Sequence, residues 1–211
     1  MSIEYVTFRL ANYETPLWPV ANFSSGRYNR EGTGPTQYLS LHPMTPWAEI
    51  LRNEDRRTRD RALLLRYPLW AIRVQFDDEP PELTFETAAR FGLAPDDLVD
   101  DDQTACQAFA EGQRSAAGGI RAFLAPSAAL PGTRNVVVLD PAVVTSYAAE
   151  PIGPEDFPTA MAAQDGRCPD GLWELVHYRG VGTPHPALDE WRSGDEFIFD
   201  EPFVTAGALA A

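Results

Sequence analysis

Two segments of this chain carry an apolar residue at every second position, and this pattern predicts β-strands. In residues 5–10 (YVTFRL) and residues 68–76 (PLWAIRVQF), every second side chain is apolar. A period of two places these side chains on one face of a strand, where a sheet buries them against other elements. Further strands are predicted at residues 37–41, 135–140 and 196–204.

Helices are predicted between these strands. The first is expected to have Thr45 as its N-cap and Pro46 at its first helical position, and to run to about residue 60. Glu49 would then lie in its first turn, where the helix dipole favours a carboxylate. Other helices are predicted at residues 84–91, 94–99 and 103–115. Because the elements show no βαβ rhythm, the expected class is α+β, a mixed sheet core with flanking helices.

We expect one domain that spans residues 1–211. The length suits a single large domain that buries a core without disulfides or metals. Residues 145–195 are rich in acidic residues, proline and glycine and have weak periodicity. They are predicted to form a surface insertion before the final strand at 196–204.

Charge and composition exclude several functions. The net charge is −14, which argues against direct nucleic-acid binding. All 17 basic residues are arginines, so lysine-based Schiff-base and P-loop chemistry is excluded. The two cysteines and three histidines show no metal-ligand spacing, so no metal site is expected. The sequence also shows no apolar run long enough to span a membrane and no signal peptide, and we expect a cytoplasmic protein.

One stretch, residues 26–50, places chemically distinctive residues in three successive local structures. Arg27 lies in a predicted loop, Tyr38 in a strand and Glu49 in a helix, each eleven residues after the last. Taken singly, each has an ordinary interpretation as a surface cation, a packed aromatic ring or a carboxylate near a helix start. We expect the three to converge on one pocket.

The chain resembles a known family, the RES-domain toxins of bacterial toxin–antitoxin pairs. Four segments in order are similar to the family pattern, and they span roughly residues 5–141: FRL with Arg9, SGRYNREGTGPTQYLSL, PWAEI with Glu49, and APSAALPGTRNVVVLDP with Ser127 and Asn135. The chain departs from that pattern where Ser25 replaces a glycine and Tyr28 replaces a tryptophan.

The resemblance implies an ADP-ribosyltransferase-like fold that takes NAD⁺ as its substrate, without a separate cofactor, and cleaves the nicotinamide–ribose bond. It implies Glu49, Arg27 and Ser127 as catalytic residues. The implied NAD⁺-binding residues are Arg9, Arg27, Tyr28, Tyr38, Ser127 and Asn135. Arginine forks suit the pyrophosphate, Tyr38 has an aromatic face for nicotinamide, and a carboxylate suits the ribosyl cation that develops. Water and phosphate both remain open as acceptors.

The resemblance also implies a partner, an Xre-like antitoxin with a helix-turn-helix region and a segment that plugs the NAD⁺ site, and it suggests a homodimer. Two alternatives remain. A protein ADP-ribosyltransferase would use the same pocket with a docking surface for its target, which residues 145–195 could supply. A catalytically inactive binding module would keep the fold but lose activity, for example through the altered loop at residues 25–28.

Overall fold

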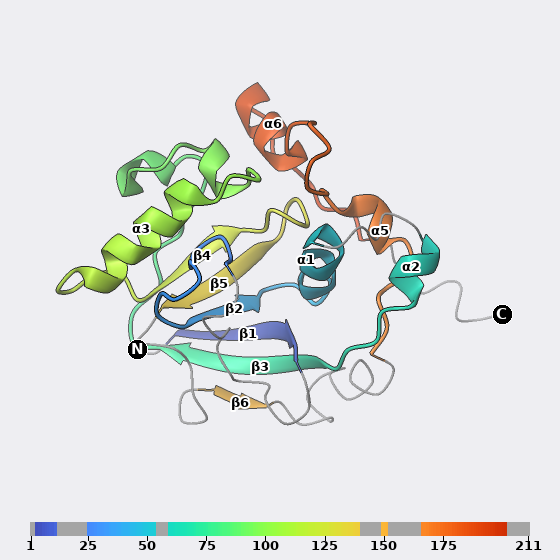
Figure 1. The fold of residues 1–211 in the computed structure, drawn as a ribbon, viewed down its shortest axis with the longest axis horizontal. Helices are drawn as coiled ribbons and strands as arrows, with labels where there is room; N and C mark the ends of the chain where they lie inside the picture. Colours follow the sequence, from blue (N-terminus) through green and yellow to red (C-terminus); the bar gives the residue numbers. More distant parts are fainter. Residues whose placement is uncertain (1–2, 12–24, 54–58, 140–148, 152–165, 202–211) are drawn as a thin grey trace.

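A computed structural model of the chain describes residues 3–11, 25–53, 59–139, 149–151 and 166–201. Its centre is a sheet in which every adjacent pair of strands is antiparallel, in the order β4-β5-β2-β1-β3-β6 (Figure 1). The strands are β1 (Ile3–Leu10), β2 (Thr36–Ser40), β3 (Leu69–Phe76), β4 (Ala122–Pro126), β5 (Arg134–Leu139) and β6 (Ala149–Pro151).

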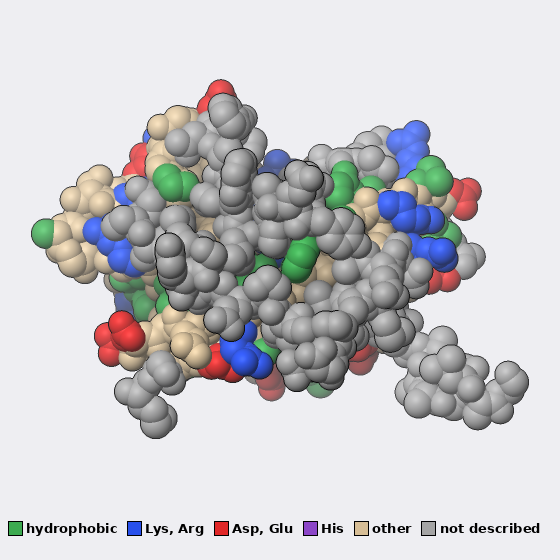
Figure 2. All heavy atoms as spheres, turned by 90° about the horizontal axis from the view of Figure 1, so that it is seen from below, with side chains coloured by type: hydrophobic (Ala, Val, Ile, Leu, Met, Phe, Trp, Pro, Cys, Tyr) green, Lys and Arg blue, Asp and Glu red, His purple; other side chains and the backbone are tan. Residues whose placement is uncertain are grey.

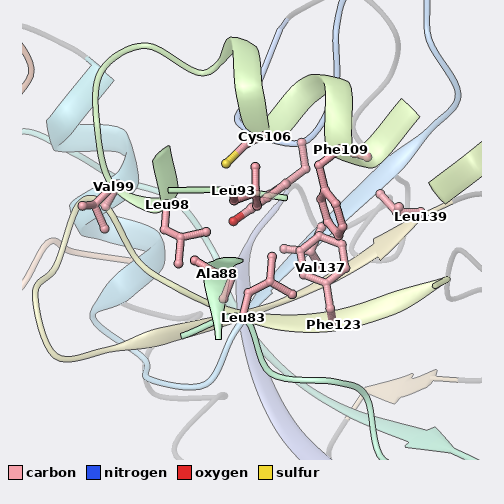
Figure 3. Packing of buried hydrophobic residues seen from close by; sticks show 14 of the residues in the cluster. Leu83, Ala88, Leu93, Leu98, Val99, Cys106, Phe109, Phe123, Val137 and Leu139 are labelled. Atoms are coloured by element: carbon pink, nitrogen blue, oxygen red, sulfur yellow. The ribbon is translucent and has the colours of Figure 1, made fainter. Parts of the chain in front are cut away.

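The sheet packs against other residues on both of its faces. Neighbouring residues of a strand point to opposite faces, and in β4 and β5 they belong to two different clusters. Phe123 of β4 lies beside Val137 of β5 on the face covered by α3 (Thr104–Ser115), where Cys106 and Phe109 pack against them (Figure 3). The next pair, Leu124 and Val136, joins a second cluster with buried residues of β2 and β3. The two-sided burial explains why β4 and the last four residues of β5 are apolar.

The predicted strands at 5–10, 37–41, 68–76 and 135–140 correspond to β1, β2, β3 and β5. The helix at 103–115 is confirmed as α3, and 3₁₀-helices η1 (Ala88–Phe91) and η2 (Asp96–Leu98) lie within the two predicted short helical segments. β4 was not predicted, since its sequence AFLAP lacks alternation. The class, a mixture of helices with an antiparallel sheet, agrees with the α+β prediction.

The first helix, α1 (Thr45–Asn53), begins one residue earlier than expected. Its first turn therefore contains no acidic residue, and the prediction that Glu49 lies there is wrong. The Thr45 hydroxyl donates to the Thr133 hydroxyl at 2.9 Å instead of capping the helix. Part of the predicted extension to residue 60 falls outside the described residues, and α2 (Arg59–Leu63) follows them.

The C-terminal part differs from the predicted surface insertion. Residues 149–151 form β6 on the edge of β3, and α5 (Leu172–Leu175) and α6 (Pro186–Ser193) follow. Leu172 packs against α1, and Leu188 joins the cluster beneath α3. The predicted strand at 196–204 is wrong over residues 196–201, which form no regular element, and its remainder falls outside the described residues.

The surface carries charge of both signs. Seen from below, arginine side chains gather at the end of the molecule where α2 lies (Figure 2), and Arg61 and Arg66 there are exposed. Both cysteines, Cys106 and Cys168, are buried and free. None of the helices in the described ranges is long and apolar enough to cross a membrane.

Candidate active site

A cavity of about 490 Å³ lies where the ends of several elements meet. Its wall includes six residues predicted for the site: Arg9, Arg27, Tyr28, Tyr38, Glu49 and Asn135. They come from β1, the loop before β2, β2 itself, α1 and the start of β5. The expected convergence of Arg27, Tyr38 and Glu49 on one pocket is thus what the fold produces.

Glu49 is fixed by hydrogen bonds on one side of its carboxylate. Its Oε1 accepts a hydrogen bond from the Ser127 hydroxyl at 2.9 Å and lies 3.4 Å from Nδ2 of Asn135. The Ser40 hydroxyl donates to Oδ1 of Asn135 at 2.7 Å, which orients that amide. Ser40 and Asn135 are direct partners across β2 and β5, so sheet register sets this network.

Ser127 lies behind Glu49 and has no exposed surface. Its oxygen also accepts hydrogen bonds from the backbone N–H groups of Ala129 and Leu130, at 3.2 and 3.1 Å. Serine often makes such bonds where a chain turns, and here the turn follows the end of β4 at Pro126. Ser127 is absent from the cavity wall, so this geometry does not give the direct ligand contact that the resemblance implied.

The loop that carries Arg27 is held against Tyr38. The Tyr38 hydroxyl donates to Oδ1 of Asn29 at 2.8 Å and accepts from the Tyr28 backbone N–H at 2.9 Å. A Cβ on Gly26 would lie 2.7 Å from Oδ1 of Asn29 and 2.9 Å from the Tyr38 hydroxyl, so only glycine fits there. Burial raises the pKa of Tyr38, which therefore stays a neutral hydroxyl donor.

The charge of the wall is strongly positive. Its arginines are Arg9, Arg27, Arg52 and Arg179, and Glu49 is its single carboxylate among the described lining residues. Burial lowers the pKa of Arg9 to about 10, and its Nη1 atom is buried without a hydrogen-bond partner in the described residues. A guanidinium that is buried with unused donors fits an anionic ligand.

Arg27 is anchored by the backbone of the loop around η2. Its Nη1 donates to the carbonyl of Asp97 at 2.8 Å, and its Nη2 donates to the carbonyl of Asp100 at 2.6 Å. Carbonyl acceptors hold the guanidinium without cancelling its charge. The arrangement therefore orients Arg27 and leaves its positive charge available to the cavity.

The family model of the RES domain matches residues 6–159. The chain belongs to the RES domain family. A probable NAD(+) phosphorylase of Mycobacterium tuberculosis is 32% identical over 114 residues, which are 54% of this chain and 52% of that protein. The match thus spans about half of the relative's length.

A solved structure shares the fold of this RES domain. It is the crystal structure of the M. tuberculosis MbcT-MbcA toxin–antitoxin complex, which matches with a TM-score of 0.56 and 20% sequence identity. The alignment covers 80% of this chain and 92% of the matched chain. At this identity the comparison establishes that the two share a fold.

Two site residues of the RES domain differ from their expected roles or were missed. Tyr28 lines the cavity but is almost completely buried, and its ring packs edge-on against Phe123 with centroids 4.9 Å apart. It therefore shapes the wall as part of the core. Arg52 was missed, although it lies three residues after Glu49 on α1, a spacing that places both on one helix face.

Arg179 was also missed, because residues 145–195 were interpreted as a surface insertion. It reaches the cavity from the segment after α5. No group of His, Cys, Asp or Glu side chains in the described part of the chain is arranged to hold a metal ion. The described wall provides arginines, one carboxylate and a hydrogen-bonding network.

Proposed function

We propose that this RES domain is the toxin of a toxin–antitoxin pair and that it degrades NAD⁺ by cleaving the nicotinamide–ribose bond. The observation that carries the proposal is a carboxylate, Glu49, that is oriented by neutral donors within a cavity otherwise rich in arginine. Family membership and the relative named as a probable NAD(+) phosphorylase support the same activity.

The wall fits the charges of NAD⁺. The diphosphate is anionic, and in a chain of net charge −14 it needs a local cluster of arginines to bind. Arg9 on β1 and Arg27 in the loop before β2 supply this cluster. Tyr38 is half-buried, and its ring offers a surface on which a planar nicotinamide can stack.

Glu49 would act on the bond that breaks. When the bond between ribose C1′ and the nicotinamide nitrogen breaks, its electron pair goes to that nitrogen and neutralises the pyridinium ring. Nicotinamide therefore leaves without a general acid, and positive charge develops on the ribose, as in other glycosyl transfers. The Glu49 carboxylate, already held by Ser127 and Asn135, stabilises this cation without reorganisation.

We propose phosphate as the acceptor, because the 32% identical relative from M. tuberculosis is named a probable NAD(+) phosphorylase. A phosphate oxygen then forms the new bond to C1′, and the products are nicotinamide and a phosphorylated ADP-ribose. The cavity arginines would bind this second anion as well as the diphosphate. With water as acceptor, the same cation would give ADP-ribose and a proton.

We further propose how this RES domain is folded, located and assembled in the cell. We propose an ADP-ribosyltransferase-like fold, a cytoplasmic location and a homodimer, with an Xre-like antitoxin as partner. The antitoxin would supply the helix-turn-helix region that binds DNA, since this chain is too acidic to bind DNA itself. A further segment of the antitoxin would occlude the cavity. The matched fold in a toxin–antitoxin complex supports the existence of such a partner.

The test is NAD⁺ consumption by the purified protein, in phosphate buffer and in a phosphate-free buffer. We expect nicotinamide release that depends on phosphate, with a phosphorylated ADP-ribose as co-product. Free ADP-ribose in both buffers would assign a glycohydrolase instead. Transfer of labelled ADP-ribose to a protein would favour the transferase alternative, and no turnover together with no NAD⁺ binding would refute the proposal.

A further inference from the structure

Arg179 lies at the rim of the cavity and comes from a part of the chain beyond the family match. The match ends at residue 159, whereas Arg179 lies between α5 and α6. Its side chain lines the cavity, yet the residue is exposed. An exposed arginine on the wall of a pocket lies where a ligand enters.

The backbone on the N-terminal side of Arg179 is held in place. The His177 N–H donates to the carbonyl of Ala129 at 2.9 Å, and the His177 carbonyl accepts a hydrogen bond from Nη1 of Arg52. Tyr178 is buried, and its hydroxyl donates to the carbonyl of Trp173 at 3.0 Å. These bonds tie the segment to the turn after β4 and to α1.

The backbone on the C-terminal side is held by Asp101. Its Oδ2 accepts the Gly180 N–H at 2.7 Å, and its Oδ1 accepts Nη2 of Arg52 at 2.8 Å. Gly180 has φ of +69°, a left-handed conformation that glycine adopts more readily than residues with a side chain. Among residues 177–180, Arg179 is the one that lines the cavity. The backbone is anchored on both sides of it, at His177 and at Gly180.

Arg52 cannot serve the ligand in the same way. It is only 4% exposed, and its charge is already paired with the Asp101 carboxylate, whereas Arg27 donates to backbone carbonyls. Its pKa is lowered by burial first and then by the positive charge of Arg27, and the charge of Arg179 contributes in the same direction. The arginines are close enough to repel one another, and a bound anion would relieve that repulsion.

We propose that Arg179 binds phosphate groups of the substrate at the cavity mouth, and that Arg52 and Asp101 position it there. This rests on the NAD⁺-cleaving function proposed above. The shared chemistry is a phosphate anion, which is either the diphosphate of the dinucleotide or the inorganic phosphate acceptor. Arg179 would then set affinity for one of the two, while Glu49 acts on the ribose.

The test compares the variants Arg179→Gln and Arg167→Gln with the wild type. Arg167 is also exposed and lies before α5, outside the cavity wall, so its variant controls for the loss of one positive charge. NAD⁺ is titrated at saturating phosphate, and phosphate is titrated at saturating NAD⁺. We expect Arg179→Gln to raise one KM by about 5- to 20-fold with kcat nearly unchanged, as for a lost binding contact.

The KM that rises identifies the anion. Asp101→Asn, which weakens the positioning pair, should raise the same KM in the same direction, and Arg179→Lys should recover part of the loss. If both KM values of Arg179→Gln equal those of Arg167→Gln, the inference is wrong.

A failure of the proposed function would be recognisable separately, because the wild type would then consume no NAD⁺. In that case NAD⁺ and inorganic phosphate are titrated by calorimetry into the wild type, Arg179→Gln and Arg167→Gln. Weaker binding to Arg179→Gln alone would uphold the role of Arg179. Equal binding to all three, or no binding to the wild type, would overturn it.

Discussion

Replacing Ser127 with alanine tests whether one buried hydroxyl both stabilises the fold and orients Glu49. The substitution removes the donor to Glu49 and leaves the N–H groups of Ala129 and Leu130 without their acceptor. Ser127, Ala129 and Leu130 have no exposed surface, so water cannot replace the hydroxyl. A buried donor that loses its partner costs about 1–3 kcal/mol.

The two N–H groups share one oxygen at distances above 3 Å, so we expect a total loss of about 2–4 kcal/mol in the free energy of unfolding. For a chain of this length, that corresponds to a fall in Tm of roughly 5–12 °C. Urea denaturation and thermal melting measure both quantities. kcat for NAD⁺ cleavage should fall about 10- to 100-fold, since Glu49 loses its 2.9 Å hydrogen bond and the contact with Asn135 is longer, at 3.4 Å.

The matched control is Ser115→Ala. The Ser115 hydroxyl also donates one hydrogen bond, to the carbonyl of Glu111 at 2.9 Å, but it lies on the exposed face of α3. Its loss should change stability by less than about 0.5 kcal/mol. If Ser127→Ala were no less stable than Ser115→Ala and retained full kcat, the account of the Glu49 network would be refuted.

Two further predictions concern packing and pH. Gly26→Ala should lower the free energy of unfolding by about 1–3 kcal/mol in urea denaturation, because its Cβ would separate Tyr38 from Asn29. The control, Gly112→Ala, has open space around its Cβ and should not destabilise the protein. Equal stability of the two variants would contradict this prediction. Burial lowers the pKa of His185 to about 3, helped by the positive charges nearby, so the unfolded chain binds its proton first. The stability contribution of neutral His185 is therefore complete above about pH 6.5 and decreases toward pH 3, by up to about 1.4 kcal/mol per pH unit. Urea midpoints across this range should depend less on pH in His185→Gln, and an unchanged slope would exclude this cause.

Local sequence patterns predicted the parts of the fold that local physics determines. β3 alternates because Ile72 and Val74 are buried whereas Arg73 and Gln75 are exposed. The helix α3 shows its apolar residues at helical spacing. β4 gave no such signal, since the sheet buries it on both faces and its sequence is apolar throughout. Its strand character depends on pairing with β5, which no local pattern encodes.

The residues of the site also differ in how far local sequence predicted them. Arg27, Tyr38 and Glu49 were predictable as a group because a loop, a strand and a helix in immediate succession return the chain to one place. The buried position of Ser127 depends on a turn whose hydrogen bonds involve Thr133 and the following strand. Arg179 depends on contacts with residues some 80 to 130 positions earlier in the chain, which proline- and glycine-rich composition concealed.

The central claim is that an oriented Glu49 carboxylate drives cleavage of NAD⁺. The most direct measurement is the rate of nicotinamide release by the wild type and by Glu49→Gln, which keeps the size of the side chain and removes its charge. Glu190→Gln, an exposed carboxylate on α6, is the control. The account predicts a fall of at least about 100-fold in kcat for Glu49→Gln alone. Equal rates in all three proteins would contradict it.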